Sequence, residues 1–179
     1  MNSKQIETPN GRFIKVYNDL FTFAERTEFY EFSKCSVYKS TGGDSHKITT
    51  PQIFSNFSVD DVKTMGFFNT NGYKLLDKEN NLSKKDVIQY RVNLSPPFEI
   101  NNLHVDYSSL TLLYYLNMDW NIEYGGHTIF MDDEIKEPIF ISLFEPGKLI
   151  LFDGNIPHMI LSPSSNKLDH RRSFAIQYK

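Results

Sequence analysis

The sequence predicts an α+β fold in which N-terminal helices support a jelly roll, or double-stranded β-helix, of about eight antiparallel strands. Apolar residues recur at helical spacing in the first half, whereas short runs of β-branched and aromatic residues separated by turn dipeptides begin near Asp86. A length of 179 residues with 40% hydrophobic residues suits one globular domain. We therefore expect a single domain over 1–179, with mainly helical support in 1–85 and the jelly-roll core in 86–179.

Two helices are expected in the first half. Thr22 followed by Glu25 has the form of a capping box, and apolar residues follow at helical spacing to about Lys34. Ser58 precedes two acids in what would be the first turn of a second helix. The Asn71-Gly72 pair predicts the end of that helix.

The second half has the short strands and frequent turns that are typical of an all-β core. The expected strands are 86–94, 102–106, 109–117, 127–131, 138–143, 147–152, 156–161 and 171–178. The dipeptides between them favour chain reversal: Pro96-Pro97, Gly125-Gly126, Pro146-Gly147 and Asp153-Gly154. Two packed sheets would protect the edges of so many short strands, which favours the jelly roll.

Composition excludes several classes of protein. The balance of 19 basic and 22 acidic residues gives a net charge of −3, which argues against a dedicated nucleic-acid binder. Cys35 is the single cysteine, so the chain can form no internal disulfide framework and no zinc ribbon. The sequence contains no apolar run long enough to span a membrane and no export signal, so we expect a cytoplasmic protein without a membrane partner.

A metal site is indicated by His104-Val105-Asp106. Side chains at i and i+2 of a strand share one face, so this strand would present an imidazole and a carboxylate together. His158, at the start of a later strand, is the best third ligand. The competing histidines are His46, His127 and His170. Two histidines and one carboxylate form the facial triad of non-haem Fe(II) oxygenases.

An anion site is indicated by the last strand. Alternation places Arg171 and Ser173 on one face and Arg172 on the other. A guanidinium beside a hydroxyl can donate several hydrogen bonds to one carboxylate. The assignment of Arg171 rather than Arg172 depends on this alternation.

The order of these motifs resembles the Fe(II)- and 2-oxoglutarate-dependent dioxygenases, in the prolyl 4-hydroxylase-like branch. The resemblance covers about 89–179 and includes the stretches 112–120 and 125–130. It implies that His104, Asp106 and His158 bind iron. It also implies that Arg171, Ser173 and Tyr115 bind the distal carboxylate of 2-oxoglutarate; a packed aromatic is the alternative for Tyr115.

The same resemblance implies an activity. The expected reaction is hydroxylation of prolyl residues in a peptide or protein, with dioxygen consumed and 2-oxoglutarate converted to succinate and CO2. Ascorbate is a possible additional reductant. Two departures weaken the substrate inference: His127 stands where relatives usually have an acid, and the last strand lacks a tryptophan.

Alternatives remain open at this point. They are a nucleic-acid or small-molecule oxygenase with the same iron centre, and a catalytically silent jelly-roll binding module. Substrate-binding loops are expected in 42–56, 94–102 and the acidic triplet 132–134. The sequence leaves the oligomeric state undetermined.

Overall fold

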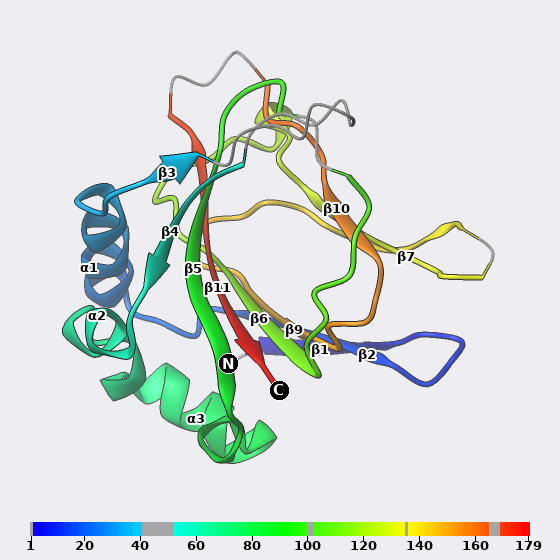
Figure 1. The fold of residues 1–179 in the computed structure, drawn as a ribbon, viewed down its shortest axis with the longest axis horizontal. Helices are drawn as coiled ribbons and strands as arrows, with labels where there is room; N and C mark the ends of the chain where they lie inside the picture. Colours follow the sequence, from blue (N-terminus) through cyan, green and yellow to red (C-terminus); the bar gives the residue numbers. More distant parts are fainter. Residues whose placement is uncertain (1, 41–51, 100–101, 135, 165–168) are drawn as a thin grey trace.

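The molecule is built from two facing antiparallel sheets with helices on one outer face (Figure 1). The computed structural model describes residues 2–40, 52–99, 102–134, 136–164 and 169–179. Within these residues, an eight-stranded sheet has the order β1-β2-β9-β6-β11-β5-β4-β3 and a three-stranded sheet has the order β10-β7-β8. This architecture confirms the jelly roll, with more strands than the eight expected.

The second half supplies most of the core strands at the positions expected from the sequence. In the large sheet these are β5 (Val87–Ser95), β6 (Leu110–Tyr115), β9 (Leu149–Phe152) and β11 (Arg171–Tyr178). In the small sheet they are β7 (Thr128–Met131), β8 (Pro138–Ser142) and β10 (His158–Ile160).

The structure corrects one predicted strand, because residues 102–106 form no regular strand. His104 makes an isolated antiparallel bridge with His158, in which each backbone N–H donates to the other residue's carbonyl oxygen at 3.1 and 2.9 Å. This single bridge brings the two imidazole rings close together, with 4.4 Å between their centroids.

Strands also occur in the first half, which was expected to be mainly helical. They are β1 (Asn2–Glu7), β2 (Phe13–Asn18), β3 (Lys39–Ser40) and β4 (Ile53–Phe57). The β1–β2 hairpin extends one edge of the large sheet by pairing with β9, and β4 extends the other edge by pairing with β5. The first half therefore widens the sheet as well as covering it.

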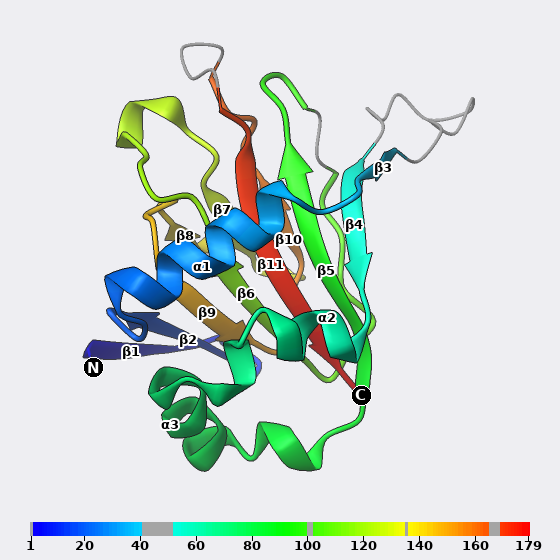
Figure 2. The same cartoon turned by 90° about the vertical axis from the view of Figure 1, so that its left-hand side faces the viewer.

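Three helices cover the outer face of the large sheet (Figure 2). They are α1 (Phe23–Lys34), α2 (Val59–Thr64) and α3 (Asn71–Asn80). The capping box of Thr22 and Glu25 at the start of α1 is present as predicted. Aromatic rings fill the layer between the helices and the sheet: Phe29, Phe67, Tyr114 and Phe174 are all buried there. No helix within the described residues is long and apolar enough to cross a membrane.

The interpretation of Asn71-Gly72 as a helix end is wrong. The preceding helix α2 ends at Thr64, and Gly66 then adopts a left-handed φ of 76°. Thr70 caps α3, so Gly72 lies in the first turn of a new helix. Glycine is needed there because a Cβ would collide with the backbone carbonyl of Leu20.

We expect Gly72→Ala to destabilise the fold by about 1–3 kcal/mol, because the added methyl group overpacks a helix against backbone that cannot move aside easily. Urea denaturation followed by circular dichroism measures this free energy of unfolding. Asn71→Ala changes the exposed neighbouring residue and is the control. A Gly72→Ala protein as stable as the wild type would contradict the close packing of α3 on the 20–21 segment.

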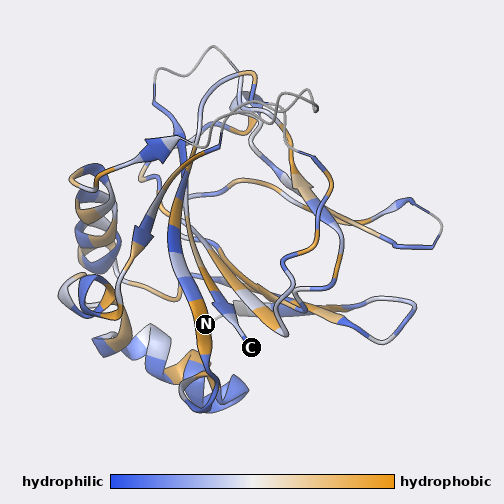
Figure 3. Ribbon diagram, viewed as in Figure 1, coloured by the Kyte–Doolittle hydropathy of each residue, from blue (hydrophilic) through white to orange (hydrophobic). Residues whose placement is uncertain are grey.

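Alternation along the central strands separates two cores. On β6, Leu112 and Tyr114 face the helices, whereas Leu113 and Tyr115 face the interior between the sheets. Figure 3 shows hydrophobic and hydrophilic residues mixed along β5 for the same reason. The interior between the sheets is the location of the site.

Candidate metal and cofactor site

His104, Asp106 and His158 meet between the two sheets. Their potential ligand atoms all lie within 4.8 Å of one another. Nε2 of each histidine is 3.7 Å from Oδ1 of Asp106. The structure therefore brings together the three residues that the sequence singled out.

The two imidazoles are held in the tautomer that a metal ligand requires. Nδ1 of His104 lies 2.9 Å from the carbonyl oxygen of Asn102, and Nδ1 of His158 lies 2.9 Å from that of Ile156. A carbonyl oxygen only accepts hydrogen bonds, so each Nδ1 carries the hydrogen and each Nε2 keeps its lone pair. Both free lone pairs are on the nitrogens nearest Asp106.

The carboxylate of Asp106 is held in place through Oδ2, the oxygen that does not face the histidines. Thr111 donates a hydrogen bond of 2.7 Å from Oγ1 to Oδ2, and the Thr111 hydroxyl is itself 2.9 Å from Ser108 Oγ. The backbone N–H of Asp106 donates to the carbonyl oxygen of Gly154 at 2.9 Å. Oδ1 is thereby left facing the two histidines, and such outer contacts orient a ligand and tune its affinity for metal.

Burial keeps His158 in its neutral form. Desolvation lowers the pKa of this imidazole below its ordinary value, and it outweighs the opposing effect of the Asp106 carboxylate. A neutral imidazole is the form that binds a metal ion. Two imidazole nitrogens and one carboxylate oxygen, converging from two segments of the chain, fit a divalent metal of the Fe(II) type.

We expect Thr111→Val to weaken metal binding roughly 10- to 100-fold, because valine keeps the shape of the buried side chain but cannot hold Oδ2 of Asp106. Titration of the apoprotein with Mn(II), followed by electron paramagnetic resonance, measures the affinity. Thr27→Val, on the exposed face of α1, is the matched control. Equal affinities for the two variants would show that the Thr111 contact does not position Asp106.

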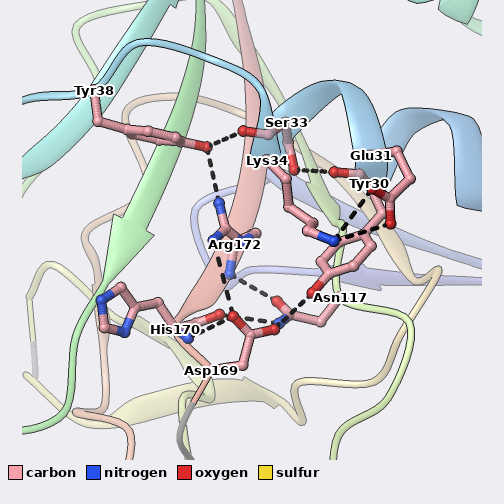
Figure 4. Close-up of polar contacts among 9 residues, drawn as sticks. All are labelled: Tyr30, Glu31, Ser33, Lys34, Tyr38, Asn117, Asp169, His170 and Arg172. Atoms are coloured by element: carbon pink, nitrogen blue, oxygen red, sulfur yellow. Dashed lines mark hydrogen bonds and ion pairs between the residues drawn. The ribbon is translucent and has the colours of Figure 1, made fainter.

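Of the competing histidines, the two that the structure describes do not join the cluster. His127 accepts a hydrogen bond at Nδ1 from the backbone N–H of Phe144, 3.1 Å away, which gives it a structural role just before the start of β7. His170 lies on the outer side of the sheet beside Asp169 (Figure 4). His46 lies outside the described residues.

A pocket of about 170 Å³ opens beside the histidines and the carboxylate. Its lining includes apolar groups near the cluster, namely Leu113, Phe152, Ile160 and Ala175. Its polar lining includes Gln89, Arg91, Asn93, Glu99, Thr128, Ser173 and Gln177. Along the paired strands β5 and β11, this lining runs from Asn93 and Ser173 to Gln89 and Gln177.

Arg171 does not line this pocket; it is 0% exposed and lies behind Ser173 and Thr128, which do line it. Its Nε donates to the carbonyl oxygen of Gly126 at 2.7 Å. Its Nη1 and Nη2 donate to the hydroxyl oxygens of Ser173 and Thr128, each at 3.2 Å. Alternation along β11 thus places Arg171 and Ser173 as the sequence predicted.

The arrangement around Arg171 is suited to an anion. Among the described residues no carboxylate forms an ion pair with it, and burial lowers the pKa of its guanidinium. The hydroxyl oxygen of Thr128 accepts from both Arg171 and Tyr115, and that of Ser173 accepts from Arg171. Both hydroxyl hydrogens thus remain able to donate toward a ligand, with a buried positive charge behind them.

Tyr115 belongs to the same group of residues. Its ring packs on Phe144 at 4.4 Å between centroids, and its hydroxyl donates to Thr128 at 2.8 Å. Burial raises the pKa of this hydroxyl, which remains protonated as a donor. The ring also lies 5.2 Å from the Arg171 guanidinium, so Tyr115 helps to hold that cation.

Arg172 is on the other face of β11, in a separate polar network (Figure 4). Its guanidinium contacts Tyr38 and Asp169, and its backbone N–H donates to Asn117 at 2.7 Å. Tyr30 on α1 also donates to Asp169. These contacts attach the start of β11 to α1 and so fix the register that turns Arg171 inward.

Several site residues were not predicted from the sequence. Thr111, Thr128 and Arg91 reach the pocket because of pairing between strands that are distant along the chain. The same is true of Gly126, whose left-handed φ of 74° and missing side chain give Arg171 access to its carbonyl. The sequence shows the Gly125-Gly126 pair, but it does not show that Gly126 contacts Arg171.

The expected substrate loops are only partly at the pocket. Gln52 and Ile53 line it from the first loop, and residues 41–51 lie outside the description. Ser95 and Glu99 line it from the second. The acidic triplet does not line it: Asp133 pairs with Arg12 at 3.0 Å, as expected for a solvated turn held by a surface ion pair.

Comparison with known proteins supports this fold. No family model matches the sequence, and no curated protein matches it. Among solved structures, a 2OG-Fe(II) oxygenase family protein from Burkholderia pseudomallei has a TM-score of 0.69 and 11% identity, over 93% of this chain and 84% of that one. A prolyl hydroxylase from Trichoplax adhaerens, in complex with a hypoxia inducible factor peptide fragment, has a TM-score of 0.65 and 16% identity, over 92% and 82%.

Similar structures carry out different reactions. A non-haem α-ketoglutarate-dependent epimerase from nogalamycin biosynthesis has a TM-score of 0.69 and 14% identity, over 93% of this chain and 77% of that one. At these identities the likeness concerns the fold. The chain has the fold of the 2OG-Fe(II) oxygenases, prolyl hydroxylases among them, and carries a His-Asp-His cluster inside it.

Proposed function

We propose that this protein is an Fe(II)- and 2-oxoglutarate-dependent oxygenase. The observation that carries the proposal is one pocket with two parts: a His-Asp-His cluster with its ligand atoms converging, and a buried guanidinium behind two hydroxyl donors. A metal ion and a dicarboxylate are the ligands that these two parts fit together.

His104, Asp106 and His158 would hold the iron through Nε2, Oδ1 and Nε2. When bound, Fe(II) supplies dioxygen activation coupled to the oxidative decarboxylation of 2-oxoglutarate to succinate and CO2. Three protein ligands would leave coordination positions open for the keto acid and dioxygen.

Arg171 and Ser173 would hold the distal carboxylate of 2-oxoglutarate, together with Thr128 and Tyr115. Their role is to orient: a carboxylate fixed at that end points the rest of the keto acid toward the His-Asp-His cluster. The apolar side chains between the two ends, Leu113 and Ala175, limit the water that can compete for the ligand.

The leading substrate is a prolyl residue in a peptide or protein, and the leading reaction is its hydroxylation. Support comes from the motif order of the second half and from the likeness to prolyl hydroxylases. The free, exposed Cys35 suits a reducing compartment, so the cytoplasm is the proposed location. Ascorbate as an accessory reductant belongs to the same proposal.

The test is anaerobic reconstitution with Fe(II), followed by measurement of succinate from 2-oxoglutarate in air, with and without a panel of proline-containing peptides. We expect succinate that depends on added iron and rises with a matching peptide. Folded, iron-loaded protein that makes no succinate under any condition would overturn the proposal in favour of a binding module.

A further inference from the structure

Arg91 is a second cation in the pocket, at a position that the proposed iron and 2-oxoglutarate sites do not use. It lies in the middle of β5, where it is paired with Ala175 of β11 on one side and Asn56 of β4 on the other. Ala175 and Arg91 both line the pocket, together with Asp106. Arg91 is therefore on the wall of the pocket that β5 provides.

Two contacts hold the Arg91 guanidinium in place. Its Nε donates to Oδ1 of Asn56 at 3.2 Å, and its Cζ lies 4.4 Å from the centroid of the Phe54 ring. One contact fixes the edge of the guanidinium and the other fixes its plane. A planar cation that is stacked and tethered in advance loses little freedom when it binds a ligand.

The charge of Arg91 is not neutralised by an ion pair with any described residue. Burial lowers the pKa of its guanidinium, and the charge that raises it again is that of Asp106, which would be committed to the metal. Glu99, the other acid of the pocket lining, acts on Arg171 instead. Among the residues that the structure describes, this half-buried cation therefore has no dedicated anion.

The neighbours of Arg91 on the same wall are neutral amides. Gln89 and Asn93 flank it along β5, and Gln177 follows from β11. A single fixed guanidinium among neutral hydrogen-bonding groups suits a singly charged, planar anion, which accepts two parallel hydrogen bonds from the guanidinium. It is less suited to a doubly charged phosphate, which usually recruits several cations.

We propose that Arg91 binds a carboxylate of the primary substrate, so that this enzyme acts on a carboxylate-bearing molecule. The inference rests on the proposed oxygenase function and narrows its substrate class. The carboxylate has two possible sources: an acidic side chain beside the target residue of a peptide, or the α-carboxylate of a free amino acid.

The experiment uses two matched pairs of probes and the full chain, loaded with Mn(II) and 2-oxoglutarate without oxygen. The first pair is an N-acetylated, C-amidated peptide with proline between two aspartates, and the same peptide with asparagines. The second pair is free L-proline and L-prolinamide. Calorimetry measures the four dissociation constants for the wild type, Arg91→Gln and the control Arg12→Gln, which removes a cation from the surface β1–β2 hairpin.

For one pair we expect the carboxylate member to bind the wild type at least about tenfold more tightly than its amide, as for a charge-assisted bidentate contact. That preference should fall below about twofold in Arg91→Gln and persist in Arg12→Gln. Preference within the peptide pair assigns the carboxylate to a side chain, and preference within the proline pair assigns it to a free amino acid.

The inference is overturned if the wild type binds neither carboxylate probe more than about twofold better than its amide, or if Arg91→Gln keeps the preference. Inorganic phosphate is titrated into the wild type in the same way, and tighter binding of phosphate than of either carboxylate probe would also overturn the inference. Because the readout is binding, the two claims can fail separately. A wild type that prefers carboxylates but makes no succinate would contradict only the oxygenase proposal. A wild type that makes succinate without such a preference would contradict only this inference.

Discussion

His104→Ala should abolish iron-dependent succinate formation and weaken binding of a divalent metal by at least about 100-fold, more than the loss of an outer contact would. The substitution leaves two protein ligands of the three that converge on the pocket. The imidazole of His104 is 44% exposed, so its removal creates no cavity in the core. The loss can therefore be separated from misfolding.

Metal affinity from Mn(II) titration and succinate from the reconstituted enzyme are the two measurements. His127→Asn is the matched control: it also removes an imidazole near the pocket, but the asparagine oxygen can still accept from the N–H of Phe144. A His104→Ala protein that keeps wild-type metal affinity would remove this residue from the site. A His127→Asn protein that loses metal would indicate that the ligand set is wrong.

Arg171→Gln should raise the dissociation constant for 2-oxoglutarate by about 100-fold, which corresponds to about 2.7 kcal/mol. The reason is that the buried guanidinium is the only cation joined to the Ser173 and Thr128 hydroxyls among the described residues. Arg172→Gln should change this constant by less than about threefold, because its charge is on the opposite face of β11 and is paired with Asp169.

Calorimetric titration with 2-oxoglutarate in the presence of Mn(II) measures both variants, and urea denaturation confirms that each is folded. Arg171→Lys gives a second comparison, since it keeps a positive charge but not the fork of donors. A larger loss in Arg172→Gln than in Arg171→Gln would mean that the register of β11 differs from the one described.

Much of the fold could be predicted because residues that alternate along a strand must face opposite layers. The strands from β5 to β11 have this pattern, and the turns between them carry glycine and proline. The edge strands lack such a signal: Ile6 is the single apolar residue of β1, and β3 has only two residues. Their positions depend on pairing with β2 and β4, which local sequence does not encode.

The site residues likewise include some that the sequence could predict and some that it could not. His104 and Asp106, and Arg171 and Ser173, are i and i+2 pairs, so their common direction could be predicted from spacing alone. Thr128 and Arg91 could not, because they reach the pocket through the fold of β7 and β5 around it. The prediction that a helix ends at Gly72 was wrong because glycine allows both a turn and a close approach of two backbones. The sequence alone does not distinguish these two roles.

The most direct measurement is a crystal structure of the full chain with Mn(II) and 2-oxoglutarate, grown without oxygen. We expect one metal ion bound by Nε2 of His104, Oδ1 of Asp106 and Nε2 of His158, and the distal carboxylate of 2-oxoglutarate at Arg171 and Ser173. The pocket face of Arg91 should remain open for substrate. A metal bound by other residues, or a 2-oxoglutarate whose distal carboxylate lies on Arg91, would contradict the proposed site.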